Sequence, residues 1–318
     1  MIPHELSVRI KEKAAALGFS GCGIARAEHL AGDEERLKRW LDAGRQAGMQ
    51  YMERNFEKRT DPRLLAEGTK TVISLLYNYF PGKETNCENG FRLAKYAYGV
   101  DYHELIREKL DILCKVMLEI DHKAVTRGFV DSAPVLERAW ANRAGLGWIG
   151  KNGMLITRKQ GSFFFLAEIL TSLEPEYDDP FAGNYCGNCS ECLDSCPTGA
   201  IAAPGIIDAN RCISYLTIEN KGEIPESLRG KWDKWIFGCD ACQDVCPWNR
   251  FSVGHAEPAF VPTFELASMQ TGDWLNLDKE RFGSLFKHSA VKRCKYEGLK
   301  RNIDFVNAKE IHDSDCDS

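Results

Sequence analysis

The chain has 318 residues, enough for about two domains, and its 44% hydrophobic and 27% charged residues are typical of a globular protein that buries a core. The formal net charge of −5 argues against a uniformly basic surface for nucleic acid, although a local basic face remains open. No stretch reaches the roughly 18 uncharged apolar residues that a membrane span needs. Residues 1–13 contain no apolar signal core, so we expect a cytoplasmic protein.

Helix-like and strand-like patterns alternate over the first 175 residues or so. Helical spacing of apolar residues, together with a serine and a proline suited to a helix start, predicts helices over 5–17, 102–120 and 134–144. Runs of β-branched and other apolar residues predict strands over 71–77, 125–130 and 162–170. Four glycines between residues 145 and 153 predict a turn with close backbone approach.

The chain divides into three parts. A stretch rich in proline, aspartate and glycine, residues 174–184, has the composition of a linker. We therefore expect a first domain over 1–175, a cysteine-rich domain over 176–250 and a C-terminal cap with a basic segment over 251–318. The fold class expected from these elements is α+β, with an α/β-type N-terminal domain.

Thirteen cysteines are unusual in a chain without a secretion signal, and their distribution is uneven. Eight lie between residues 186 and 246, and the other five are single: Cys22, Cys87, Cys114, Cys294 and Cys316. In a reducing compartment, such a concentration of thiols favours metal or redox chemistry over disulfides.

The clustered cysteines form two related motifs. The first is C-x2-C-x2-C-x3-C-P over residues 186–197, which is the bacterial ferredoxin signature for a [4Fe–4S] cluster. The second, C-x2-C-x3-C-P over 239–247, lacks a first cysteine, which Cys212 replaces. In this signature the last cysteine of each run ligates the other cluster. Cluster I is therefore expected to take Cys186, Cys189, Cys192 and Cys246, and cluster II Cys196, Cys212, Cys239 and Cys242.

Two structural zinc sites are the main alternative, because C-x2-C pairs also suit tetrahedral zinc. Zinc sites, however, usually consist of separated pairs and not of a run of four that ends in Cys-Pro. With all eight thiolates used as ligands, two adjacent clusters form a path for single electrons and not a site of reaction. The first domain must then hold the partner that receives the electrons.

At this point the chain resembles the epoxyqueuosine reductases, iron–sulfur enzymes that complete queuosine in tRNA. The resemblance covers roughly residues 1–305 and includes both cysteine motifs. The other matching motifs are YMxRN at 51–55, RxDPR at 59–63, YAYGxDYH at 96–103, DSAPxLER at 131–138, GLGWxGKN at 145–152 and CISYLTIE at 212–219.

The resemblance implies a cobalamin in the N-terminal domain, whose fold would be similar to that of reductive dehalogenases, and a ferredoxin-like module with two [4Fe–4S] clusters. Electrons from an external donor would pass through the clusters to cobalt. Epoxyqueuosine at the wobble position of tRNA would be reduced to queuosine, with Asp131 as the proton donor. From the sequence alone, Asp131 or Ser132 could equally be the N-cap of the next helix.

The residues expected to line the cofactor or the base pocket are Arg59, Tyr98, His103, Asn152 and Glu168. The Asp101-Tyr102-His103 triplet is interpreted as a helix start with Asp101 as N-cap and not as a cobalt-binding motif. For each of these residues a fold-supporting role is the alternative.

One segment near the C-terminus is basic. Residues 287–301 carry six lysines and arginines against one glutamate, a local excess of +5. A solvated charged face is the usual meaning of such a segment, and a strip that contacts RNA phosphates is the functional alternative. The expected tRNA contacts are Lys221, Lys292, Arg293, Lys295, Lys300 and Arg301.

We therefore expect a monomeric enzyme that acts on tRNA and has no membrane partner. Two other functions remain open. A corrinoid reductive dehalogenase would share the electron path but act on a halogenated small molecule. A non-catalytic ferredoxin-type electron carrier would contain iron but no cobalt.

Overall fold

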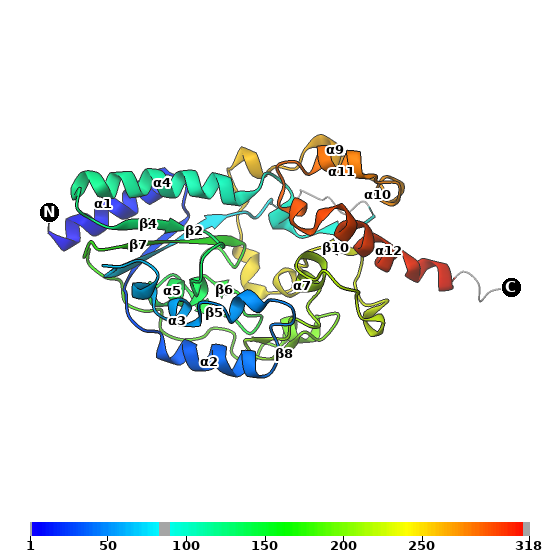
Figure 1. Ribbon diagram of the computed structural model, residues 1–318, viewed down its shortest axis with the longest axis horizontal. Helices are drawn as coiled ribbons and strands as arrows, with labels where there is room; N and C mark the ends of the chain where they lie inside the picture. The colour runs from blue at the N-terminus through cyan, green and yellow to red at the C-terminus, as the bar shows by residue number, and fades with distance from the viewer. Residues whose placement is uncertain (1, 83–89, 314–318) are drawn as a thin grey trace.

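The computed structural model describes residues 2–82 and 90–313, so Cys87 and Cys316 lie outside the described residues (Figure 1). Its centre is a four-stranded sheet in the order β1-β2-β7-β4, in which all neighbours are antiparallel. The strands are β1 (Gly21–Arg26), β2 (Thr71–Asn78), β4 (Thr126–Phe129) and β7 (Phe164–Thr171). The three predicted strands are thus confirmed to within two residues, and so is the α+β class.

Two helices cover one face of this sheet (Figure 1). Alternate residues of β2 and β7, such as Ile73 and Ala167, pack against the apolar stripes of α1 (Pro3–Ala16) and α4 (Tyr102–Ile120). The α4 helix begins as predicted, because the Asp101 carboxylate accepts a hydrogen bond from the backbone N–H of His103 at 3.0 Å.

The other face carries α2 (Ala31–Asp42), α3 (Phe56–Thr60) and α5 (Glu137–Arg143), with Trp140 fully buried between α5 and the sheet (Figure 1). The prediction that a helix starts at Pro134 is wrong. Asp131 has a left-handed backbone (φ +50°), and short turns then join Ser132 to Val130 and Val135 to Ala133, so residues 131–136 form a loop.

The β1 strand was not among the predicted strands, because glycine interrupts its apolar pattern. Gly23 lies so close to the end of α5 that a Cβ there would be 2.1 Å from the carbonyl oxygen of Ala144. Only glycine allows this approach. The predicted glycine turn after α5 is present as a hairpin of β5 (Trp148–Ile149) and β6 (Leu155–Ile156), where a Cβ on Gly147 would be 2.2 Å from the carbonyl oxygen of Ile156.

The cysteine-rich segment contains short elements only. The elements are α6 (Glu191–Asp194), β8 (Ile201–Ala203), β9 (Ile206–Ile207), α7 (Ile213–Ile218), β10 (Trp235–Phe237) and α8 (Ala241–Asp244). The β10 strand pairs in parallel with β3 (Arg92–Leu93), which lies in the predicted first domain.

The C-terminal segment is helical. It consists of the 3₁₀ helix η7 (Ala290–Cys294) and the helices α9 (Phe264–Ser268), α10 (Thr271–Leu275), α11 (Lys279–Leu285) and α12 (Lys295–Asp313). These helices form a second core with Phe91, Leu93, Ile236 and Phe237. The domain boundaries near residues 175 and 250 stay a prediction. Within the described residues, no helix is long and apolar enough to span a membrane.

Candidate active site and cluster loops

The eight clustered cysteines lie in two groups of four. Group I consists of the four cysteines predicted for cluster I, which line one cavity of about 210 Å³ together with Trp248: Cys186, Cys189, Cys192 and Cys246. The loop that carries Cys186 and Cys189 is held in place by Lys151, whose Nζ donates to the carbonyl oxygens of Gly187 and Cys189 at 2.7 Å.

Group II consists of the four cysteines predicted for cluster II, whose thiols are close enough to interact electrostatically: Cys196, Cys212, Cys239 and Cys242. Because α6 and α8 pack against each other, Cys196 leaves the first motif toward group II, and Cys246 leaves the second toward group I. This exchange is the one expected of paired cubanes.

The spacing of the thiols also bears on zinc. Among the described residues, no three His, Cys, Asp or Glu side chains are close enough together to hold a single metal ion. A tetrahedral zinc ion needs its sulfurs about 2.3 Å from one centre, whereas a four-iron cubane holds its cysteines farther apart. The exchange of Cys196 and Cys246 between the two groups favours paired cubanes over two separate zinc sites.

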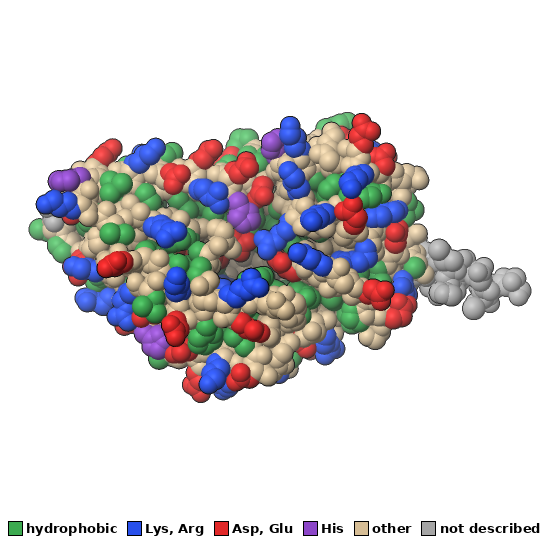
Figure 2. Space-filling view, in the orientation of Figure 1, with side chains coloured by type: hydrophobic (Ala, Val, Ile, Leu, Met, Phe, Trp, Pro, Cys, Tyr) green, Lys and Arg blue, Asp and Glu red, His purple; other side chains and the backbone are tan. Residues whose placement is uncertain are grey.

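The second feature is a network of ionisable groups around Asp131. Its carboxylate accepts a hydrogen bond from Tyr102 Oη at 2.9 Å and lies 3.3 Å from His103 Nε2 and 4.0 Å from Arg293 Nη1. The Asp131 backbone N–H donates to Glu137 Oε1 at 2.9 Å. We call these five residues the Asp131 site. The space-filling view has a hollow in the middle of one face, beside which lysine and arginine side chains gather (Figure 2).

The charges of the Asp131 site are set by hydrogen bonding. Burial alone would raise the pKa of Asp131, but hydrogen bonds from His103 and Tyr102 and the positive charge of Arg293 lower it. Burial opposes the charged form of His103, yet its bonds to Asp101 and Asp131 raise the pKa of the imidazole to about 9. At neutral pH the site therefore contains an aspartate and an imidazolium.

Four residues of this region were not among the predicted site residues, and Glu137, described above, is one of them. Tyr102 stacks on Phe165, with ring centroids 3.9 Å apart, and its hydroxyl faces Asp131. Tyr51 is near Asp131 and Arg293, and burial raises the pKa of its phenol to about 12. Glu219 forms an ion pair with Arg293. Each residue belongs to a quoted motif, but spacing alone does not bring the motifs together.

Of the five predicted cofactor contacts, His103 is in the Asp131 site and Arg59 is near it. The Arg59 guanidinium donates to the carbonyl oxygen of Tyr51 at 3.0 Å, while its buried Nε has no hydrogen-bond partner among the described residues. Tyr98 is buried in the C-terminal core, and Asn152 donates to the carbonyl oxygen of Cys242 at 3.2 Å. Glu168 is fully buried on β7 beneath α5.

The predicted tRNA contacts differ in their surroundings. Lys221, Lys292 and Lys295 are exposed, and Arg293 belongs to the Asp131 site. Lys300 donates to the carbonyl oxygen of Leu275. Arg301 donates to three carbonyl oxygens around the end of α7, those of Leu216, Asn220 and Gly222. The last two side chains thus support the fold, and their contact with RNA stays a prediction.

Aromatic rings connect group II with the Asp131 site. Phe237, which lies two residues before Cys239, has its ring 6.1 Å from that of Tyr96. The Tyr96 ring is 6.2 Å from that of Tyr102, which contacts Asp131. Group I is nearer the surface, beside the half-exposed Tyr185. The order is therefore group I, group II, Asp131 site.

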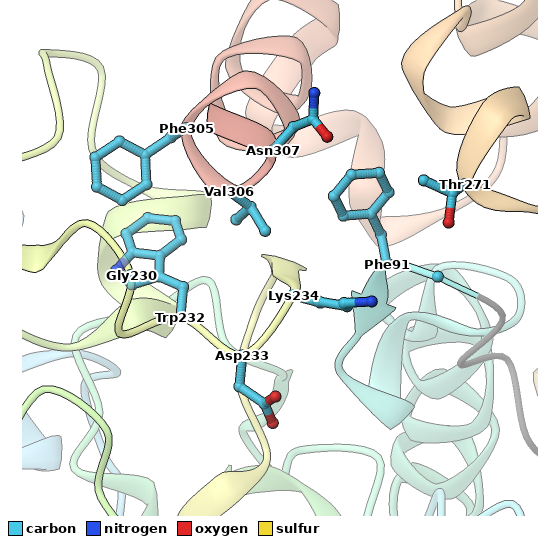
Figure 3. Close-up of a pocket in the computed structure, with 10 residues that line it drawn as sticks. Phe91, Gly230, Trp232, Asp233, Lys234, Thr271, Phe305, Val306 and Asn307 are labelled. Atoms are coloured by element: carbon cyan, nitrogen blue, oxygen red, sulfur yellow. The ribbon is translucent and has the colours of Figure 1, made fainter. Parts of the chain in front are cut away.

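A further pocket of about 270 Å³ shares no lining residue with either cysteine group or with the Asp131 site (Figure 3). Trp232 and Phe305 form one wall with ring centroids 4.8 Å apart, and Phe91 lies across from them (Figure 3). Asp233 and Lys234, both with positive φ, lie at its base (Figure 3).

Fold and cysteine arrangement together define an iron–sulfur protein with two [4Fe–4S] clusters. Residues 185–249 match the family model described as "4Fe-4S double cluster binding domain", and residues 59–132 match "Epoxyqueuosine reductase QueG, DUF1730". An epoxyqueuosine reductase of Cellulophaga algicola is 50% identical over 297 residues, which are 93% of this chain and 96% of that protein. The chain belongs to the epoxyqueuosine reductase family, a family of oxidoreductases.

Two solved structures of this family are similar along nearly the whole chain. One is an epoxyqueuosine reductase with an epoxyqueuosine-modified tRNA stem loop (TM-score 0.85, 32% identity, 96% of this chain and 81% of that one). The other, from Bacillus subtilis, has a catalytic aspartate loop swung out of the active site (TM-score 0.87, 32% identity, with the same coverage). Membership of this family disfavours the two alternative functions that the sequence left open, a corrinoid reductive dehalogenase and a non-catalytic electron carrier.

Proposed function

We propose that this protein reduces epoxyqueuosine to queuosine in tRNA, with Asp131 as the proton donor. The observation that carries the proposal is the order of the parts, in which the group II cysteines adjoin an ionisable site through Phe237, Tyr96 and Tyr102. A site that receives electrons and holds exchangeable protons suits the removal of an epoxide oxygen as water. The relative solved with an epoxyqueuosine stem loop supports the same substrate here.

The proposal includes a cobalamin near the Asp131 site. One observation that fits such a group is the buried Arg59 Nε, a donor that lacks a partner among the described side chains. Arg59 and His103 would hold the cofactor from the side of the Asp131 site, and Tyr98, Asn152 and Glu168 would support that arrangement from the surrounding core. When bound, cobalamin would supply a low-potential cobalt centre that reduces the epoxide.

Asp131 needs a proton before it can act as an acid. A carboxyl group with a pKa at or below its usual value of about 3.9 is almost fully ionised at pH 7. The Asp131 side chain is 46% exposed without substrate, so a bound base and cofactor would displace water from it. We expect this desolvation to raise its pKa toward neutrality. The Bacillus subtilis relative has a catalytic aspartate loop, and Asp131 likewise lies on a loop, residues 131–136 before α5, which supports Asp131 for the role.

The tRNA would lie across the hollowed face (Figure 2), where its anticodon loop can present an unstacked wobble base. Lys221, Lys292 and Lys295 are exposed and would contact phosphates, with Arg293 at the entrance to the site and Lys300 and Arg301 behind them. We further propose that the protein is a cytoplasmic monomer that takes electrons from an external donor through group I.

The test is anaerobic turnover of tRNA that carries epoxyqueuosine, with the protein reconstituted with iron, sulfide and cobalamin. The wild type should form queuosine, and Asp131→Asn should lower the rate at least about 100-fold, as expected when a general acid is removed. Asp121→Asn, at the exposed end of α4, is the matched control and should retain the wild-type rate. Full turnover by Asp131→Asn would remove this residue from the mechanism, and wild-type protein without turnover would contradict the proposed substrate.

A further inference from the structure

An aromatic surface borders the cavity of group I. Tyr185 and Trp248 line this cavity with their ring centroids 6.2 Å apart, and the Phe251 ring is 6.0 Å from that of Trp248. Tyr185 is 41% exposed and Phe251 is 39% exposed, and Val253, two residues further along the chain, is 67% exposed. Exposed apolar side chains that are grouped in this way mark a surface that contacts another molecule.

Basic side chains lie at the edges of this surface. Arg158 Cζ lies 4.1 Å from the centroid of the Tyr185 ring, and Arg250 Cζ lies 4.6 Å from that of the Phe251 ring. Lys159 follows Arg158, and all three basic residues are exposed. We call this set of aromatic and basic side chains the group I face: Tyr185, Trp248, Phe251, Arg158, Lys159 and Arg250.

The turn that carries two of these charges is fixed by hydrogen bonds. Residues 157–161 form a turn that is closed by a backbone hydrogen bond of 2.8 Å between its first and last residues. Ser252 Oγ donates to the carbonyl oxygen of Gln160 at 3.1 Å, which ties the turn to the segment after the second cysteine motif. The basic side chains of the turn are therefore held beside the exposed rings.

A single buried side chain connects the group I face with a cluster ligand. The Trp148 indole nitrogen lies 3.5 Å from Cys186 Sγ. The Trp148 ring is 5.3 Å from that of Tyr185 and 4.9 Å from that of Trp248. An electron that arrives at this face thus crosses one layer of side chains to reach group I, whereas group II and the Asp131 site lie further along the path.

We propose that the group I face is the docking site of a one-electron carrier protein with an acidic surface, an inference that rests on the proposed function. Carboxylates around the redox centre of the carrier would pair with Arg158, Lys159 and Arg250, and its apolar surface would pack on the exposed rings. Glu191 is a carboxylate on the cavity wall, but the three cations outnumber it, so the face attracts negative charge. Such complementarity speeds the encounter and orients the partners.

Each encounter would transfer one electron. The carrier is oxidised and the cluster held by group I is reduced, and no bond forms or breaks in this step. Removal of an epoxide oxygen as water leaves a C=C bond and consumes two electrons and two protons, with the protons taken up at the Asp131 site. Two encounters therefore supply one turnover. A spent carrier has to leave before the next one binds, and a small, largely electrostatic interface permits this exchange.

Basic and aromatic side chains together also suit single-stranded RNA. The carrier is favoured here because the group I face adjoins the cysteine group nearest the surface, on the far side of group II from the Asp131 site, where the wobble base is proposed to react. The two partners therefore have separate places on the protein.

The test uses fully reduced flavodoxin, an acidic flavoprotein, as the carrier. It is mixed anaerobically with protein reconstituted with iron and sulfide, without tRNA or cobalamin, and the absorbance of the flavin semiquinone reports each electron transferred. The rate constant for the wild type should fall as the ionic strength rises. Arg158→Gln with Lys159→Gln should lower it about ten-fold at low salt and make its salt dependence less steep. Lys115→Gln with Lys123→Gln, on and just after α4, is the charge-matched control.

Two further measurements separate docking from damage to the clusters. Each variant should retain about eight iron atoms per chain, and reduced methyl viologen, a small reductant that needs no docking surface, should reduce all of them at the wild-type rate. Phe251→Ser should weaken the binding of oxidised flavodoxin a few-fold in a calorimetric titration, in which no electron moves, and should leave the salt dependence unchanged.

Three results would overturn the proposal. One is a wild type that takes no electron from flavodoxin although methyl viologen reduces it, and another is an equal rate constant for the wild type and Arg158→Gln with Lys159→Gln. The third is weaker tRNA binding by this double variant with an unchanged rate from flavodoxin, which would assign the group I face to RNA. Failure of the wild type to reduce epoxyqueuosine would refute the proposed function separately, because the transfer assay contains no tRNA.

Discussion

The cluster loops and the Asp131 site are neighbours in the structure, but they differ in the chemical groups of which they consist. Group I and group II consist of thiols in short loops, and their surroundings are aromatic rings and backbone groups, such as the Trp148 indole 3.5 Å from Cys186 Sγ. The Asp131 site consists of side chains that carry or exchange protons, and its members come from three segments of the chain, residues 102–103, residues 131–137 and Arg293. Electron transfer needs fixed ligands, whereas proton transfer needs groups whose charges can change. A substitution in the cluster loops should therefore abolish a cluster and the activity together. A substitution in the Asp131 site should lower activity or stability by a smaller amount that depends on pH.

The largest effect is expected for a ligand of group II. Cys242→Ser should remove one cluster, lowering iron from about eight to about four atoms per chain and reducing turnover to background. Cys114→Ser, within α4, is the matched control and should keep all of the iron. Iron analysis and the absorbance of anaerobically reconstituted protein measure both. Zinc in place of iron in the wild type would refute the paired clusters.

The difference between the regions also explains what the sequence could predict. Within each run the neighbouring cysteines are separated by two or three residues, and the known exchange of the last cysteine of each run then predicts both groups. The Asp101 cap of α4 is equally local. The start of α5 was misplaced because proline favours a helix start, while the left-handed Asp131 and the turns after it keep the chain in a loop. The sequence offers no local sign of that conformation.

Long-range packing accounts for the other omissions. Arg293 and Asp131 are 162 positions apart in the sequence, and no pattern within either segment predicts that they lie close together. The three carbonyl partners of Arg301 are 79 to 85 positions away in the sequence, so the local charge pattern around Arg301 favoured a surface role. Glu168 lies in an apolar strand pattern, and only the structure reveals that its carboxyl oxygens have no hydrogen-bond partner in the described part of the chain.

The second prediction concerns the charges of the Asp131 site. The pKa of His103 is raised from about 6.5 to about 9, because its ion pairs favour the charged imidazolium. These ion pairs stabilise the fold fully below pH 6.5, as long as the carboxylates are ionised. Their contribution is lost as the pH rises through 9. His103→Gln should therefore lower the free energy of unfolding by about 2 kcal/mol at pH 6 and by much less at pH 9.5.

Chemical denaturation of anaerobic protein at the two pH values measures this difference. His122→Gln, at the exposed end of α4, is the control and should show no such pH dependence. A loss of stability in His103→Gln that is equal at both pH values would mean that the imidazole acts through packing alone. In that case the contact between His103 and Asp131 would not depend on charge, and the proposed difference between the cluster loops and the Asp131 site would be wrong at this contact.

The smallest effect is expected at the rim of the Asp131 site, where the exposed Lys292 and Lys295 flank Arg293. If both lysines contact phosphates, Lys292→Gln with Lys295→Gln should weaken tRNA binding a few-fold, and the slope of log affinity against log salt should become less steep by about 1 to 2. Lys115→Gln with Lys123→Gln, on and just after α4, is the charge-matched control. Equal slopes of log affinity against log salt for the two double variants would mean that Lys292 and Lys295 are solvated and do not contact phosphates. The reason is that a phosphate contact releases counterions, whereas a solvated charge does not.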